Sequence, residues 1–186
     1  LPWIGLAGPT ASGKTAVALE AMLIAVEGGA QAALLAPTEI LARQHYETLS
    51  RMAAPTGVTI ALLTGRDKGK ARESILMGLL DGSIDIIIGT HAIFQDTVAY
   101  RNLALVVIDE EQRFGAADKA TLRKLAVNGH VLSLTATPIP RTLAMSYYAD
   151  LDVSTLDELP PSRTPIVTKL VNESRREEVI ARIRAQ

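Results

Sequence analysis

The feature that most constrains this chain is a regular alternation of short apolar runs with longer stretches of helical pattern. The runs are continuously apolar, which is typical of strands covered by helices on both faces. We expect strands over residues 3–8, 32–36, 59–63, 84–89, 103–109 and 130–135. Helical patterns cover residues 14–26, 40–52, 70–81, 116–125 and 140–147. The alternation predicts an α/β domain with a mostly parallel sheet and helices on both faces. Residues 14–26 are apolar nearly all round, so we expect that helix to be deeply buried.

The length and composition fit one globular domain with a short addition. The chain has 186 residues, of which 48% are hydrophobic and 21% charged, a balance typical of folded proteins. Adjacent prolines in residues 157–163 indicate a linker, because proline interrupts regular structure. We expect a domain over residues 1–156. After the linker we expect a strand over 164–171 and a helix over 174–185, as the start of a truncated second domain over residues 164–186.

Charge and residue content exclude several classes of function. The 19 Lys and Arg nearly balance the 20 Asp and Glu, so the chain does not hold nucleic acid by bulk positive charge. Cysteine is absent, which excludes disulfides, thiolate zinc sites and a cysteine nucleophile. His45, His91 and His130 are scattered without a carboxylate ligand pattern, so we expect no zinc. No apolar run approaches a membrane span, and we expect a cytoplasmic protein.

A phosphate-binding loop lies between the first expected strand and the first expected helix. The sequence Gly-Pro-Thr-Ala-Ser-Gly-Lys-Thr fits the pattern G-x-x-x-x-G-K-[ST] at every fixed position. Glycines let successive backbone N–H groups face phosphate oxygens, and the following helix adds its positive end. We expect the lysine to neutralise the β- and γ-phosphates of ATP and the last threonine to bind Mg²⁺. The candidate nucleotide-binding residues are Gly8, Pro9, Thr10, Ala11, Ser12, Gly13, Lys14 and Thr15.

Two acidic residues follow the apolar run 103–108. A buried parallel strand delivers the side chains after it to the carboxyl edge of the sheet, where ligands bind in open α/β sheets. Asp109 is the candidate metal ligand, and Glu110 is the candidate base for an attacking water. A solvated acidic cap is the alternative, but the phosphate loop makes a catalytic pair the better interpretation.

Together these segments resemble a known family. The phosphate loop and residues 36–45, 88–95, 107–115 and 134–142 are similar, in this order, to motifs I, Ia, Ib, II and III of superfamily 2 helicases. The extensions Gln-Arg-Phe-Gly and Thr-Pro-Ile-Pro-Arg-Thr resemble the RecG family of ATP-dependent DNA helicases and the related transcription-repair coupling factors. His-Ala-Ile-Phe-Gln is more like RecG, whereas Asp-Glu-Glu-Gln is more like the coupling factors, so both families stay open.

The resemblance implies a fold and an activity. It implies a RecA-like P-loop NTPase domain, the first of two motor domains, that couples ATP hydrolysis to movement on branched or duplex DNA in repair and recombination. The missing second motor domain would supply an arginine finger, so the chain alone should hydrolyse ATP very slowly. Gln112 would contact the γ-phosphate or motif III. Thr135 and Thr137 would couple nucleotide to DNA. The candidate DNA contacts are Pro37, Thr38, Arg43, Thr90, His91, Gln95 and Arg141.

The phosphate loop departs from the RecG pattern, which usually reads Gly-Asp-Val-Gly-Ser-Gly-Lys-Thr. Pro9 follows the first glycine, and Ala11 stands where RecG has glycine. We expect alanine to be tolerated, because the fixed glycines and Lys14 remain.

Two other functions stay open. The loop also resembles that of tRNA dimethylallyltransferases, so a nucleotide- or tRNA-modifying transferase is one alternative. The strand-borne Asp109 and Glu110 argue against it. The other alternative is a nucleotide-gated binding module without turnover.

Overall fold

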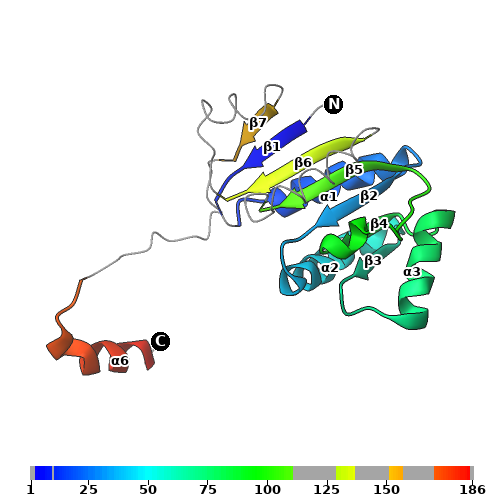
Figure 1. The fold of residues 1–186 in the computed structure, drawn as a ribbon. Coiled ribbons are helices and arrows are strands. Elements are labelled where there is room, and N and C mark those ends of the chain that lie inside the picture. The colour runs from blue at the N-terminus through cyan, green and yellow to red at the C-terminus, as the bar shows by residue number, and fades with distance from the viewer. Residues whose placement is uncertain (1–2, 10, 111–128, 137–150, 157–169, 185–186) are drawn as a thin grey trace.

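A seven-stranded sheet forms the centre of the molecule (Figure 1). The computed structural model describes residues 3–9, 11–110, 129–136, 151–156 and 170–184. The strands follow each other in the order β3-β4-β2-β5-β6-β1-β7, and all six pairings are parallel. Their bounds are β1 Trp3–Ala7, β2 Gln31–Leu35, β3 Ile60–Leu63, β4 Ile86–Gly89, β5 Leu103–Asp109, β6 His130–Thr135 and β7 Leu151–Thr155.

Helices cover both faces of the sheet. The α-helices are α1 Lys14–Glu27, α2 Glu39–Ala53, α3 Gly69–Asp81 and α6 Arg176–Arg184, and the 3-10 helices are η1 Ala54–Thr56, η2 His91–Phe94 and η5 Glu173–Arg175. Buried residues of α1 and α2 share one hydrophobic cluster, whereas α3 and η2 contribute to the other. The expected α/β fold with helices on both faces is therefore confirmed.

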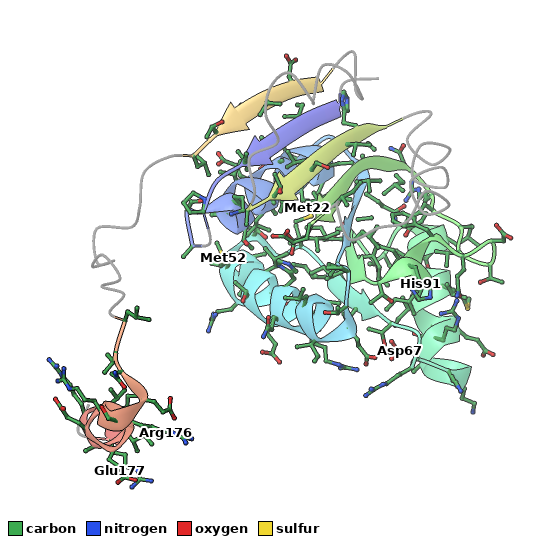
Figure 2. All side chains as sticks on the ribbon, turned by 60° about the vertical axis from the view of Figure 1, so that its left-hand side comes forward. Met22, Met52, Asp67, His91, Arg176 and Glu177 are labelled. Carbon is green, nitrogen blue, oxygen red and sulfur yellow. The ribbon has the colours of Figure 1, made fainter. Side chains whose placement is uncertain are left out.

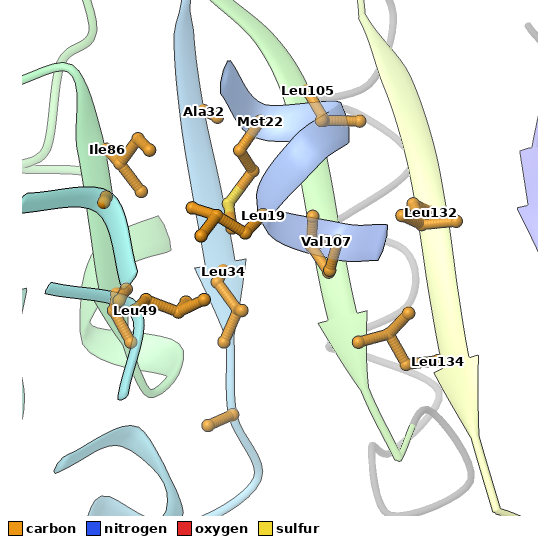
Figure 3. Packing of buried hydrophobic residues seen from close by; sticks show 14 of the residues in the cluster. Leu19, Met22, Ala32, Leu34, Leu49, Ile86, Leu105, Val107, Leu132 and Leu134 are labelled. Carbon is orange, nitrogen blue, oxygen red and sulfur yellow. The ribbon is translucent and has the colours of Figure 1, made fainter. Parts of the chain in front are cut away.

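The core explains why the strands read as continuous apolar runs. Neighbouring side chains along a strand point to opposite faces. In β2, Ala32 and Leu34 belong to the cluster under α1 and α2, whereas Ala33 and Leu35 belong to the cluster on the other face. Figure 3 shows the first cluster, in which Met22 from α1 lies over the strands. Both faces of the strand are covered, and its one polar residue, Gln31, is buried with its side-chain amide donating to the carbonyl oxygens of Leu79 and Ile84.

The first helix is less buried than its composition predicts. Ala18, Leu19 and Met22 are buried, but Val17 is 40% and Ile24 is 65% exposed. The expectation of deep burial all round is wrong, because α1 rests on the sheet through one stripe. Figure 2 shows a similar contrast between buried and exposed helix residues: Met22 of α1 lies among core side chains, and Met52 of α2 lies at the edge of the molecule.

The six expected strands are present, and their ends differ by at most two residues from the expectation. The seventh strand, β7, was missed. Its sequence, Leu-Asp-Val-Ser-Thr, is short and alternating, and it pairs only with β1, at the edge of the sheet. Polar residues are acceptable there because one side of the strand meets water: Asp152 and Ser154 are exposed.

The C-terminal part of the chain is described only in pieces. The expected helices over 116–125 and 140–147 and the linker over 157–163 lie outside the described residues. So does the expected strand up to residue 169, and residues 170 and 171 are not in a strand. The expected C-terminal helix is present as η5 and α6, whose side chains are all exposed. The boundaries of the two domains stay a prediction.

Tyr100 provides a test of how η2 is held. Its hydroxyl donates a 2.7 Å hydrogen bond to the carbonyl oxygen of Ile93 in η2, and burial raises the pKa of the Tyr100 phenol. Tyr100→Phe should lower the free energy of unfolding by about 1 kcal/mol. Because the pKa of Tyr100 is raised in the folded state, its contribution to the free energy of unfolding depends on pH. The contribution is complete below about pH 10, the pKa of tyrosine in the unfolded chain, and is lost as the pH rises above that value.

The measurement is chemical denaturation at pH 8 and above pH 10. Tyr100→Phe should show a shallower alkaline loss of stability than wild type. Tyr46→Phe is the matched control, because no hydrogen bond of the Tyr46 hydroxyl is found among the described residues. Equal alkaline slopes for wild type and Tyr100→Phe would contradict the prediction.

Candidate active site

The phosphate loop follows β1 and is closely fitted to its neighbours. The N–H of Gly8 donates to the carbonyl oxygen of Thr135 at the end of β6, 3.1 Å away. A Cβ on Gly8 would come within 2.7 Å of both the Leu156 carbonyl oxygen and the Ser12 hydroxyl. Gly13 has a φ of 96°, which side chains other than hydrogen resist. Both fixed glycines of the motif are therefore required, the first by space and the second by backbone conformation.

Lys14 is held inside the loop. Its ammonium Nζ donates to the carbonyl oxygens of Gly8 and Pro9, at 2.6 and 2.8 Å. These bonds place a positive charge within the curve of the loop, next to the start of α1. The positive end of the helix dipole acts in the same direction.

The hydrogen-bond donors of the loop are suited to binding a phosphate group. Gly13 at the N-cap supplies no side-chain hydrogen bond to α1. Its carbonyl oxygen accepts the N–H groups of Ala16 and Val17, whereas the N–H groups of Lys14 and Thr15 have no backbone acceptor among the described residues. The buried Ser12 hydroxyl has no hydrogen-bond partner within the described part of the chain. A ring of amide N–H groups, a hydroxyl and an ammonium is a donor set suited to phosphate oxygens. Thr15, in the first turn of α1, is partly exposed and supplies a second hydroxyl.

The acidic pair lies at the end of β5, and β6 alone separates β5 from β1. Both side chains are half-buried. The N–H of Glu110 donates to the carbonyl oxygen of Leu134 in β6, at 2.9 Å, and Glu110 has a φ of 53°. The structure therefore brings the phosphate loop, Asp109, Glu110 and Thr135 to one edge of the sheet, as the sequence predicted.

His45 of α2 lies next to the acidic pair, although its local sequence does not mark it as a candidate site residue. Its Nε2 lies 2.8 Å from Oδ2 of Asp109, and each side chain is 14% exposed. The contact is a single histidine–carboxylate pair. The two residues are 64 positions apart, so only the strand order, which puts β2 next to β5, could have revealed the contact. No group of three or more potential metal-binding side chains was found among the described residues.

The candidate DNA contacts begin with α2, which follows β2. Thr38 caps this helix through its hydroxyl, which accepts the N–H of Leu41 at 3.3 Å. Arg43 forms an ion pair with Glu39 at 2.9 Å. Pro37 is half-buried in the turn before the cap.

A second set of candidates follows the neighbouring strand β4. Thr90 precedes η2 but makes no side-chain cap and is 8% exposed. His91 is exposed, and the side-chain oxygen of Gln95 accepts from Arg72 of α3 at 2.9 Å. Because β2 and β4 are adjacent, both sets lie at the same edge as the nucleotide residues, on the other side of β5.

Four candidates cannot be placed. Thr10, Gln112, Thr137 and Arg141 lie outside the described residues. In the described ranges, no helix has both the length and the apolar character to cross a membrane.

The backbone of the phosphate loop yields a stability prediction. Ala11 has a φ of 67°, and a Cβ in the left-handed region costs about 1–2 kcal/mol. Ala11→Gly removes that cost, but the freer unfolded chain offsets about 0.4–1 kcal/mol of the gain. We expect a net stabilisation of about 1 kcal/mol, which raises the melting temperature by about 2–4 °C.

Gly13→Ala is the matched control for Ala11→Gly. Nothing lies within 4 Å of a Cβ on Gly13, so only its backbone conformation opposes the change, and the melting temperature should fall. A fall for Ala11→Gly as well would contradict the interpretation.

Comparison with known proteins places this geometry in a family. The family model described as DEAD/DEAH box helicase matches residues 4–146. The chain is 50% identical over 180 residues to the ATP-dependent DNA helicase RecG of Pasteurella multocida, and 47% identical over 180 residues to that of Escherichia coli K12. Each match covers 95% of this chain and 26% of the relative, so the chain spans about a quarter of the curated relatives' length.

Solved structures agree with the sequence matches. A RecG structure bound to a three-way DNA junction matches with a TM-score of 0.82 and 42% identity, over 98% of this chain and 25% of that one. The Hef helicase domain of Pyrococcus furiosus shares the fold, with a TM-score of 0.64 and 20% identity, over 83% of this chain and 35% of that one. The chain belongs to the DEAD/DEAH box helicase family and is similar throughout its length to the RecG helicases.

Proposed function

We propose that this chain is the ATP-binding motor domain of a longer DNA helicase or translocase of the RecG type, which acts in the cytoplasm on branched or duplex DNA in repair and recombination. The observation that carries the proposal is the placement of the Lys14 loop after β1 and of Asp109 and Glu110 at the end of β5, at the same edge of the sheet and each hydrogen-bonded to β6 between them. The 50% identity to a curated RecG over nearly the whole chain supports it.

The described residues divide the work of hydrolysis. Lys14 and the loop amides would hold the phosphates, and Thr15 and Asp109 would hold Mg²⁺. Bound there, the metal would neutralise charge on the phosphate oxygens. Glu110 would orient the attacking water and accept its proton. Glu110 is partly buried, and β6 lies between its strand and the strand that leads into the loop. For Gln112 we propose the contact with the γ-phosphate or motif III that the family resemblance implies. For Thr135 and Thr137 we propose that they couple the nucleotide state to DNA.

DNA is the proposed partner, as in the RecG structure that was solved with a three-way junction. The proposed contacts follow β2 and β4, where backbone N–H groups and hydroxyls can bind phosphates without reading sequence. Arg43 and Gln95 are held by Glu39 and Arg72, which fixes their direction before DNA arrives. The remaining proposed contacts are Pro37, Thr38, Thr90, His91 and Arg141.

The transferase alternative is not favoured. It shares the loop sequence, but the acids at the end of β5 and their backbone link to β6 suit water activation beside a phosphate site. The binding-module alternative differs only in the absence of turnover, so a kinetic test separates it.

Nucleotide binding is the first test. Calorimetric titration of the 186-residue chain with Mg-ADP and Mg-ATP should give saturable binding that Lys14→Ala abolishes or weakens strongly, because the charge inside the loop is gone. Lys70→Ala is the matched control, since that lysine is exposed near the start of α3, away from the phosphate loop. Absence of binding by the wild-type chain would contradict the proposal.

Turnover is the second test, made in the longer protein with a second motor domain. Glu110→Gln should keep ATP binding but lower the DNA-stimulated hydrolysis rate by roughly 10²–10⁴-fold, as expected for loss of a general base. An unchanged hydrolysis rate would contradict the proposed role of Glu110, and absence of DNA-stimulated hydrolysis by the wild-type longer protein would favour the binding-module alternative. The 186-residue chain alone should be nearly inactive, since an arginine finger is typically worth about 10³–10⁵ in rate.

A further inference from the structure

The contact between His45 and Asp109 is a polar interaction at the site that the motif pattern does not account for. We propose that His45 is a positioning residue of the metal site: it holds one oxygen of the Asp109 carboxylate and leaves the other for the Mg²⁺ that accompanies the nucleotide. This inference rests on the proposed function.

The geometry identifies the donor and the acceptor of this hydrogen bond. Nε2 of His45 lies 2.8 Å from Oδ2 of Asp109. An ionised carboxylate can only accept, so the ring nitrogen must be the donor and carry a proton. Among the described residues, His45 is the hydrogen-bond partner of the Asp109 side chain. Oδ1 of Asp109 is therefore left over as a ligand atom.

The surroundings make this bond a strong constraint. Both side chains are 14% exposed, so water competes weakly for the bond. Asp109 is the last residue of β5, whose neighbours Val107 and Ile108 are fully buried. On the other side, Ala42 and Leu49 fix α2 in the core before and after His45. The donor and the acceptor thus come from two elements that are both held in the core, where Val107, Ala42 and Leu49 belong to one hydrophobic cluster.

A hydrogen bond of this kind orients a metal ligand. A carboxylate at a strand end can rotate about its side-chain torsions, and only some orientations serve a metal held by a threonine hydroxyl nearby. Partners of metal ligands typically contribute about 10- to 100-fold to metal affinity. The competing explanation is purely structural: the pair would merely fasten α2 to the sheet. A positioning role predicts that loss of the bond weakens metal binding but leaves metal-free nucleotide binding unchanged. A purely structural role predicts no specific loss of metal affinity.

The test compares two variants of the 186-residue chain. His45→Gln keeps an amide N–H donor of similar reach, whereas His45→Leu keeps bulk but removes the donor. ADP affinity is measured by calorimetry with EDTA and over a series of Mg²⁺ concentrations. Binding of Mn²⁺ to the ADP complex is followed by electron paramagnetic resonance. In EDTA, all three proteins should bind ADP alike.

With metal, the variants should separate. His45→Leu should lower the apparent Mg²⁺ and Mn²⁺ affinity of the ADP complex by about 10-fold or more, and His45→Gln should recover most of the loss. Leu41→Ala is the matched control, because Leu41 is half-buried on α2 and packs against the core without touching Asp109. It should lower the melting temperature and leave the metal affinity unchanged.

Other outcomes overturn the inference. Wild-type metal affinity in His45→Leu, or an equal loss in Leu41→Ala, would leave only the structural explanation. Failure of His45→Gln to recover metal binding would show that the donor at this position is not what matters. No ADP binding by the wild-type chain would instead contradict the proposed function and this inference with it.

Discussion

Parallel pairing of all the strands is the constraint on which the site depends. Because every strand points the same way, every strand delivers its following residues to one edge of the sheet. Two backbone hydrogen bonds then join the segments there: Gly8 to Thr135 and Glu110 to Leu134. The central strand of the three, β6, thus sets the spacing between the phosphate loop on β1 and the acids on β5. Backbone hydrogen bonds, and not contacts between side chains, therefore set the relative positions of these segments.

The site also concentrates backbone strain. The two non-glycine residues with positive φ in the described ranges are Ala11 and Glu110, one in the loop and one at the acidic pair. Such conformations persist only where surrounding structure enforces them. For Ala11 the enforcement is the curl of the loop around Lys14, and for Glu110 it is the bond to β6. Strain here is the consequence of turning the chain sharply at a strand end while keeping donors and acids directed to one place.

The sequence predicted what depends on local pattern and missed what depends on strand order. Continuous apolar runs such as Leu103–Asp109 identified buried parallel strands, and the spacing of Gly8, Gly13 and Lys14 identified the loop. The edge strand β7 was missed because a half-solvated strand of five residues has almost no pattern. The contact of His45 with Asp109 was missed because it requires β2 to lie beside β5, which no local signal encodes. The partner of Gln95, Arg72 of α3, depends in the same way on a neighbouring helix, whereas the pairing of Arg43 with Glu39 is a local contact within α2.

Helix α2 joins the two halves of this edge. It begins at the Thr38 cap, beside the proposed DNA contacts, and two turns later places His45 on Asp109. Between and beyond these points Ala42, Leu49 and Ala53 are buried in the core. Close-packed interiors resist continuous deformation, so the helix can respond to a force at its start only as a unit. A DNA phosphate bound at Thr38 would therefore act on the same rigid body that orients the proposed metal ligand. With DNA bound as proposed, a physical connection between DNA and the nucleotide site would run through α2, separate from the one proposed for Thr135 and Thr137.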